Sequence, residues 1–263
     1  MLKLNSLFET LDKIAPLSLS HRLVEKGDYD NSGIIVNSHE NTIKVLFSLD
    51  LSKKAVEMAK RLKCDTIVTH HPAIYKPISS ISIEGDTCAL LNAIKNNLNV
   101  ISMHLNLDIA TNGIDCCFAE SLGAKKYKIL DPLDENNGYG REFDIENITF
   151  NEFIKLAKSN LKTSKITVYG KRSAILKKGA SFCGGGASYA ENFVLKKVTN
   201  ADVIVTSDMP HHVIKTIVEA GKNILIVPHY ASENYGFKMF YENVKKTLKN
   251  KVETAYFEDK RFL

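Results

Sequence analysis

The sequence alternates short runs rich in Ile, Val and Thr with amphipathic stretches, and this alternation restricts the fold more than any other feature. Parallel strands need a crossover connection, which is usually a helix, so the rhythm predicts an α/β protein with largely parallel sheets. The predicted strands are residues 43–49, 66–69, 99–103, 165–169, 202–206, 223–227 and 252–257. The predicted helices are residues 5–14, 52–62, 86–97, 113–122, 151–159, 210–220 and 232–248, with one more that ends near 199.

The two halves of the chain repeat a pattern. The run Asp65–Pro72 matches Asp202–Pro210 with one insertion, and each is a strand followed by polar residues. Further along, His104–Asp108 matches His229–Glu233, and each is a His-x-x-x-acid segment after a strand. Because the two elements come in the same order in both halves, the sequence predicts two related α/β halves that face each other. The histidines and carboxylates described below make the cleft between these halves the expected central metal cleft.

The expected halves are residues 1–130 and 131–263, either as separate domains or intertwined as one unit. The polar region 131–147, which includes Asn136-Asn137-Gly138, is predicted to be a loop between them.

Composition excludes several classes of protein. Hydrophobic residues make up 44% of the chain and charged residues 25%, which is the balance of a globular protein rather than a disordered or collagenous one. The net charge of +5 comes from lysines spread along the chain, so a nucleic-acid partner is not expected. No run approaches the ~20 apolar residues of a membrane helix, and the N-terminus lacks the pattern of a secretory signal.

The five cysteines include no C-x-x-C pair, which favours free thiols in a reducing, cytoplasmic compartment. Cys116 and Cys117 are adjacent in the sequence. This vicinal pair is either a redox site or simply two buried thiols, and its role is left open.

Most of the histidines follow predicted strands. Six of the eight do so, namely His70, His71, His104, His211, His212 and His229. In parallel α/β sheets the carboxyl ends of the strands line the ligand crevice, so side chains far apart in the sequence converge there. The pattern therefore predicts a cluster of imidazoles at strand ends.

His70 and His71 form a tandem pair that closes an apolar strand, and Pro72 keeps His71 extended. Successive strand residues point in opposite directions, so two neighbouring imidazoles can bind two different ions, or one ion if the strand bends. The alternative is a structural role, which is the commoner one for a single histidine at a strand end.

The two His-x-x-x-acid segments place an imidazole and a carboxylate one helical turn apart, where they share a face of a helix. Carboxylates can bridge two metals, and imidazole suits Zn, Fe, Ni and Cu. Alternatively, Asp108 and Glu233 only satisfy free amides at helix starts. Asp208 is likewise either a helix cap or a residue near the site, and Gly184-Gly185-Gly186 is either a phosphate cradle or a tight turn.

Several of these segments together resemble the Nif-three-like family, also named GTP cyclohydrolase I type 2 homologs. The segments are Asp30-Asn31-Ser32-Gly33, Val68-Thr69-His70-His71-Pro72, His104-Leu105-Asn106-Leu107-Asp108, Asn112-Gly113-Ile114-Asp115, Cys183-Gly184-Gly185-Gly186, Thr206-Ser207-Asp208 and Pro228-His229-Tyr230-Ala231-Ser232-Glu233. Ser207 and Pro228 stand where this family usually has glycine, and the match is thin between residues 131 and 180.

The resemblance implies a dinuclear metal centre and a toroidal homohexamer of α/β protomers. Its implied ligands are His70, His71, Asp108, His229 and Glu233, which would hold two divalent ions per protomer. The sequence does not distinguish Zn, Fe and Mn.

These expectations favour a metal-dependent hydrolase that acts on GTP or on another nucleotide-like or phosphorylated small molecule. His104, His211 and His212 lie outside the implied ligand set and are candidates for proton transfer. The alternative is a protein without turnover, either a metal-binding hexameric scaffold or a metal chaperone.

Overall fold

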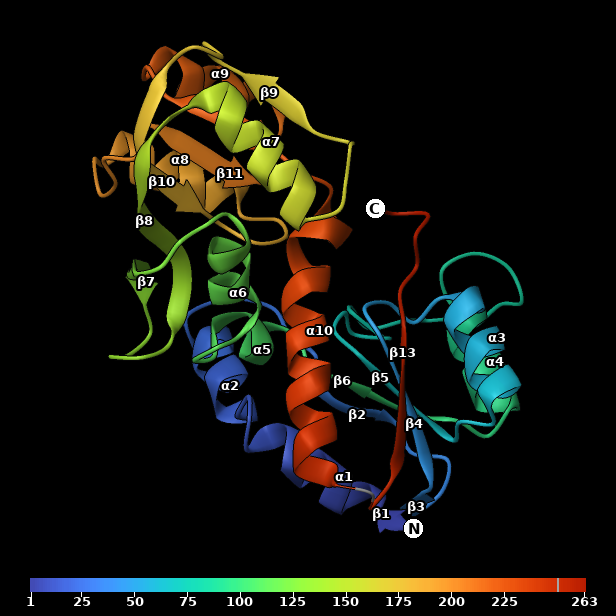
Figure 1. Ribbon diagram of the computed structural model, residues 1–263. Coiled ribbons are helices and arrows are strands. Elements are labelled where there is room, and N and C mark those ends of the chain that lie inside the picture. Colours follow the sequence, from blue (N-terminus) through green and yellow to red (C-terminus); the bar gives the residue numbers. More distant parts are fainter. Residues whose placement is uncertain (250) are drawn as a thin grey trace. The chain divides into compact units, whose positions relative to one another are not determined.

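The computed structural model describes residues 1–249 and 251–263, which divide into two compact units. Unit 1 comprises Met1–Ala110 and Phe237–Asp259, and unit 2 comprises Thr111–Gly236 and Lys260–Leu263. Each unit contains helices packed on a mixed β-sheet, which confirms the predicted α/β class (Figure 1).

The sheet of unit 1 has five strands in the order β13-β4-β5-β6-β2. These strands are β2 (Gly33–Val36), β4 (Lys44–Ser48), β5 (Thr66–Thr69), β6 (Asn99–Ser102) and β13 (Glu253–Phe257). Neighbouring strands are parallel except at the edge, where β2 runs antiparallel to β6. Strands β5 and β6 are buried throughout, with two apolar residues at the centre of each and a buried polar residue at either end.

Helices cover both faces of this sheet. Alternate strand residues point to opposite faces, and Leu46 packs with the helices α3 (Lys53–Leu62) and α4 (Cys88–Lys95), which lie side by side (Figure 1). Phe47 points the other way and contacts Tyr241 of α10 (His229–Leu248), with the ring centroids 5.2 Å apart. The smaller elements of unit 1 are β1 (Leu2–Lys3), α1 (Leu4–Asp12), α2 (Leu17–Glu25), β3 (Asn41–Thr42) and α5 (Leu105–Ile109).

The sheet of unit 2 has six strands in the order β7-β8-β10-β11-β12-β9. They are β7 (Tyr127–Pro132), β8 (Gly138–Thr149), β9 (Thr167–Tyr169), β10 (Ile175–Ser181), β11 (Val203–Thr206) and β12 (Asn223–Ile226). Only the β10-β11-β12 core is parallel. The helices are α6 (Ile114–Ser121), α7 (Phe150–Asn160), α8 (Ala187–Leu195), α9 (His211–Glu219) and the first turns of α10.

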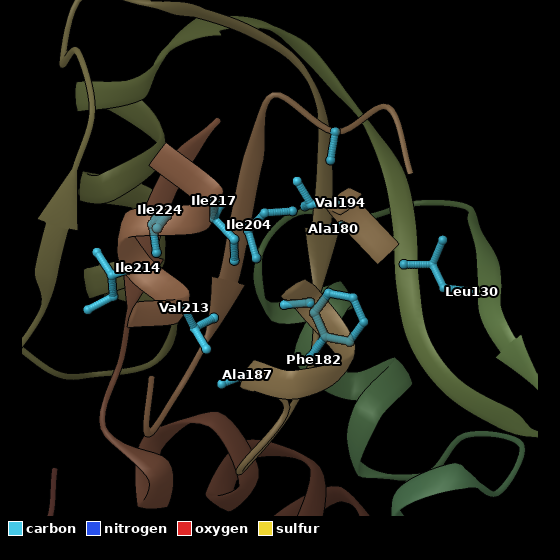
Figure 2. Packing of buried hydrophobic residues seen from close by; sticks show 12 residues of the cluster. Leu130, Ala180, Phe182, Ala187, Val194, Ile204, Val213, Ile214, Ile217 and Ile224 are labelled. Carbon is cyan, nitrogen blue, oxygen red and sulfur yellow. The ribbon is translucent and has the colours of Figure 1, made fainter. Parts of the chain in front are cut away.

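One face of the unit 2 sheet forms a core with α8 and α9 (Figure 2). Ile204 and Ile224 from neighbouring strands meet Ile217 of α9, and Phe182 lies beside them at the end of β10. Because these side chains leave water together, the core fixes the ends of β11 and β12, from which the polar residues of this unit project.

The prediction of a loop over residues 131–147 is wrong. Strands β7 and β8 form an antiparallel hairpin across this region, with Asp131 opposite Tyr139. Its polar tip is a turn in which the Asp134 carboxylate accepts hydrogen bonds from the backbone N–H groups of Asn136 and Asn137. The turn residues were therefore identified correctly, but they join two strands rather than two domains.

The two sheets share a topology. In each, three parallel strands are followed in space by an antiparallel edge strand that precedes them in the chain: β4-β5-β6 with β2, and β10-β11-β12 with β9. Asp65 accepts hydrogen bonds from backbone N–H groups at the start of β4, and Asp202 accepts two from β10. Asn99 and Asn223 hold the backbone just beyond β2 and β9 in the same way.

All five cysteines are buried and none forms a disulfide. Over residues 1–249 and 251–263, no helix is long and apolar enough to span a membrane.

Candidate metal centre

Three histidines and a carboxylate gather at the carboxyl ends of β5 and β6 in unit 1. His70 and His71 directly follow β5, and His104 follows β6 after one intervening residue. One ring nitrogen of each histidine lies within 4.8 Å of those of the other two. Asp108, on α5, approaches this group through its Oδ1, 3.4 Å from Nε2 of His70. Of the six histidines predicted to converge at strand ends, this unit brings together His70, His71 and His104.

Each of these histidines is held through its Nδ1 atom. The acceptors are the Met103 carbonyl oxygen for His70 at 2.8 Å, the Asp50 carboxylate for His71 at 2.6 Å and the Asp30 carboxylate for His104 at 2.7 Å. Carbonyl and carboxylate oxygens only accept hydrogen bonds, so Nδ1 is the donor in every case.

The Asp30 carboxylate is almost completely enclosed, with 1% of its side chain exposed. Ser20 and Ser32 both donate their hydroxyl hydrogen bonds to it. Burial alone raises the pKa of this carboxyl, but the hydrogen bonds from His104 and the two serines outweigh burial and lower the pKa to about 2. Asp30 is therefore a carboxylate at neutral pH, and it fixes the ring of His104.

A second group of polar side chains lies in unit 2. His229 begins α10 shortly after the end of β12, and its Nε2 lies 3.0 Å from Oε1 of Glu233 one turn later. The predicted sharing of a helix face by these two residues is therefore present. The Nδ1 of His229 donates to the carboxylate of Asp208, which follows β11. Asp208 does not cap α9, since Pro210 occupies the cap position and no side chain caps that helix.

The glycine turn at 184–186 packs against Glu233. A Cβ atom on Gly184 would overlap Oε1 of Glu233, and its φ of +55° lies in the left-handed region that favours glycine. The Gly184 N–H donates to the hydroxyl of Ser232 at 3.0 Å. Of the two interpretations of this segment, the contacts favour the tight turn, because this amide is directed at a neighbouring side chain.

His211 and His212 have a different environment. Both are exposed, and they occupy the first turn of α9. Within the described part of the chain, no hydrogen bond or ion pair connects their side chains with His229, Asp208 or Glu233.

Sequence reasoning missed two carboxylates and one carbonyl that hold the histidines. Asp50 lies two residues beyond β4, so the rule that polar residues converge at strand ends could have identified it. Asp30 precedes β2, and because β2 is antiparallel, its amino end lies at the same edge of the sheet. The Met103 carbonyl gives no sequence signal.

These imidazole nitrogens and carboxylate oxygens are arranged in a way that fits a bound cation. With Nδ1 donating to Asp208, a neutral His229 directs its Nε2 lone pair at a Glu233 oxygen, and His70 faces Asp108 in the same way. Two acceptors that face each other at 3.0 or 3.4 Å repel unless a proton or a metal ion is shared between them. Imidazole nitrogen and carboxylate oxygen are ligands that Zn and other divalent transition metals accept.

The fold and these groups define an α/β protein with histidine and carboxylate side chains at the ends of its parallel strands. The chain belongs to the Duf34/NIF3 (NGG1p interacting factor 3) family, whose model matches residues 2–261.

Relatives match along nearly the whole chain. A protein of Clostridium perfringens named GTP cyclohydrolase 1 type 2 homolog is 32% identical over 259 residues, which cover 96% of this chain and 95% of that protein. Among solved structures, SA1388, a hypothetical protein of Staphylococcus aureus, has a TM-score of 0.85 at 23% identity, covering 98% of this chain and 97% of the other. Reduced HcgD from Methanocaldococcus jannaschii has a TM-score of 0.80 at 25% identity, with 98% of each chain covered.

Proposed function

We propose that this protein binds two divalent metal ions per protomer and hydrolyses a nucleotide-like or phosphorylated small molecule. The proposed ligands are His70, His71, Asp108, His229 and Glu233. The proposal rests on one observation made in both units. The Nε2 atom of an imidazole faces a carboxylate oxygen, while the Nδ1 atom of the same ring donates to another acceptor. The naming of the Clostridium perfringens relative as a GTP cyclohydrolase 1 type 2 homolog supports GTP as the first substrate to test.

Divalent ions bound by these residues would supply Lewis acidity and lower the pKa of a coordinated water. The chain itself supplies the proton acceptor. His104 belongs to the histidine cluster but not to the proposed ligand set, and its Nδ1 is fixed by Asp30. Its Nε2 is thus the atom that takes or returns a proton at the substrate. His211 and His212, the other proposed candidates, are exposed side chains without such a partner.

Elemental analysis of protein purified without a chelator or an affinity metal tests the binding step. We expect about two divalent ions per chain in the wild type and loss of most metal in Asp108→Ala and Glu233→Ala, with the fold kept by circular dichroism. Glu242→Ala, on the same helix as Glu233, is the matched control and should keep its metal. Full metal content in both ligand variants would exclude this assignment.

A screen of GTP and a panel of nucleotides and phosphoesters tests turnover. Replacing His104 by Gln should keep the metal and lower turnover about 100-fold or more, the usual size of a general acid–base contribution. Loss of metal in step with activity would instead make His104 a ligand or its support. Metal binding with no turnover on any substrate would favour the scaffold or chaperone role over the hydrolase.

A further inference from the structure

One rule relates all four histidines of the candidate centre to the sheets. Each histidine at a strand end donates its Nδ1–H to an oxygen that comes from the end of the neighbouring strand. The pairs are His71 after β5 with Asp50 after β4, His70 after β5 with Met103 after β6, His104 after β6 with Asp30 before β2, and His229 after β12 with Asp208 after β11. Both units therefore use the same device.

This device selects one ring nitrogen as the ligand atom. A neutral imidazole carries a single N–H, so an acceptor at Nδ1 places the proton there and leaves the lone pair on Nε2. It also fixes the rotation of the ring, so Nε2 is directed before any ligand arrives. Outer partners of this kind are known to raise both the affinity and the geometric precision of histidine metal sites.

Asp208 combines an uncommon backbone conformation with an exposed carboxylate. Its φ of +43° lies in the left-handed region, which residues other than glycine rarely adopt. Its side chain is 60% exposed, and its carboxylate accepts a hydrogen bond from Nδ1 of His229. Asp50 is also partly exposed, and its carboxylate accepts from His71 at 2.6 Å.

We propose that Asp50 and Asp208 are positioning residues that lock His71 and His229 in the Nδ1–H tautomer, so that both histidines bind divalent metal through Nε2. This inference rests on the proposed metal-binding function. It adds two residues outside the proposed ligand set to the machinery of the site and specifies the coordinating atom of each partner histidine.

The tautomer can be measured without any metal. Protein labelled with ¹⁵N at histidine and freed of metal with EDTA is studied by solid-state NMR at mildly alkaline pH, with His71→Gln and His229→Gln used to assign the two signals. We expect the proton on Nδ1 of both residues in the wild type. In Asp50→Ala and Asp208→Ala we expect the corresponding histidine to lose that preference, whereas Asp→Asn at either position restores it because the amide oxygen also accepts a hydrogen bond.

Zinc titration of the same proteins supplies the second measurement. Each alanine variant should bind Zn²⁺ about 10–100-fold more weakly than the wild type, and each asparagine variant should recover most of that loss. Asp86→Ala removes an exposed carboxylate elsewhere in unit 1 and should change neither measurement.

A wild-type protein with the proton on Nε2 of His71 or His229 would overturn the inference, as would alanine variants with unchanged tautomers and unchanged zinc affinity. If the wild type binds no zinc, the proposed function fails. The metal-free spectra would then still decide whether the carboxylates lock the rings, so the two failures remain distinguishable.

Discussion

A single carbon added at Gly184 tests how closely the glycine turn packs against Glu233 in unit 2. The φ of +55° at Gly184 and the contact of this residue with the Glu233 carboxylate both disfavour a Cβ atom. Gly184→Ala should lower the free energy of unfolding by about 1–2 kcal/mol from backbone strain alone, and it should also reduce metal content by displacing Glu233.

The neighbouring Gly185 is the matched control. A Cβ there meets nothing within 4 Å, so Gly185→Ala should change stability by less than about 0.5 kcal/mol. Urea unfolding and elemental analysis of both variants provide the comparison. Equal stability and equal metal content of the two variants would show that the close approach of Gly184 to Glu233 has no energetic consequence.

Asp30 gives a pH dependence with a definite sign. Its pKa in the folded protein is about 2, below the ordinary value of 3.8, so its stabilisation is complete above pH 3.8 and is lost as the pH falls toward 2. A shift of this size corresponds to about 2 kcal/mol of stability at neutral pH, of which about 1 kcal/mol is gone at pH 3.

Asp30→Asn should therefore be less stable than the wild type at pH 7 and should lose about 1 kcal/mol less on acidification to pH 3. Urea unfolding at the two pH values measures both quantities. The exposed Asp86 provides the control through Asp86→Asn, which should follow the wild type at both. If Asp30→Asn lost as much stability as the wild type between pH 7 and pH 3, the role assigned to the hydrogen bonds of Asp30 would be refuted.

At the scale of elements, the sequence predicted the helices and strands whose hydrophobic period or burial is uniform along the segment. Strand β5 was predicted at the residues where it occurs, because Thr66–Thr69 is buried throughout and is bounded by Asp65 and the histidines. The helix at the end of the chain was predicted from residue 232, but α10 begins at His229, so its first turn includes that histidine.

Strand β8 was not predicted, because only one of its partners, β7, is close in the sequence, whereas β10 and the partners of its buried polar side chains are distant. It contains the fully buried Arg141, whose charge is paired with Asp115 of α6 at 2.9 Å. It also contains Glu142, which accepts a hydrogen bond from Thr199. A local pattern shows only a polar segment, whereas tertiary pairing makes it a strand. Asp30 was missed because it precedes β2, a strand that was not predicted, whereas the convergence of polar residues at strand ends could have identified Asp50.

Helix α7 offers a test of local stability. Thr149 accepts a hydrogen bond from the N–H of Glu152, and the Glu152 carboxylate accepts from the N–H of Thr149, which forms a capping box. Thr149→Ala should cost about 1 kcal/mol in the free energy of unfolding. Thr216→Ala, inside α9, removes only a bond back to the His212 carbonyl and should be neutral or slightly stabilising. Equal losses in both variants would contradict a capping role.

At the scale of the whole molecule, the prediction is assembly. The resemblance stated from the sequence implies a homohexamer, and we propose that assembly for this chain. Light scattering or sedimentation at micromolar concentration should give about six times the chain mass of 29.4 kDa. A stable monomer under these conditions would remove the hexamer without affecting the ligand assignments, which rest on residues within each protomer.

The buried thiols allow the unfolding of this protein to be followed by their chemical reaction. The chain has no tryptophan, so the usual fluorescence probe of unfolding is missing. Cys64 and Cys88 belong to unit 1, whereas the other three thiols, of Cys116, Cys117 and Cys183, belong to unit 2. A thiol-specific dye should react slowly with the native chain, because all five are buried. During denaturation, the number of dye molecules taken up then reveals which unit has opened: two for unit 1, three for unit 2 and five for both.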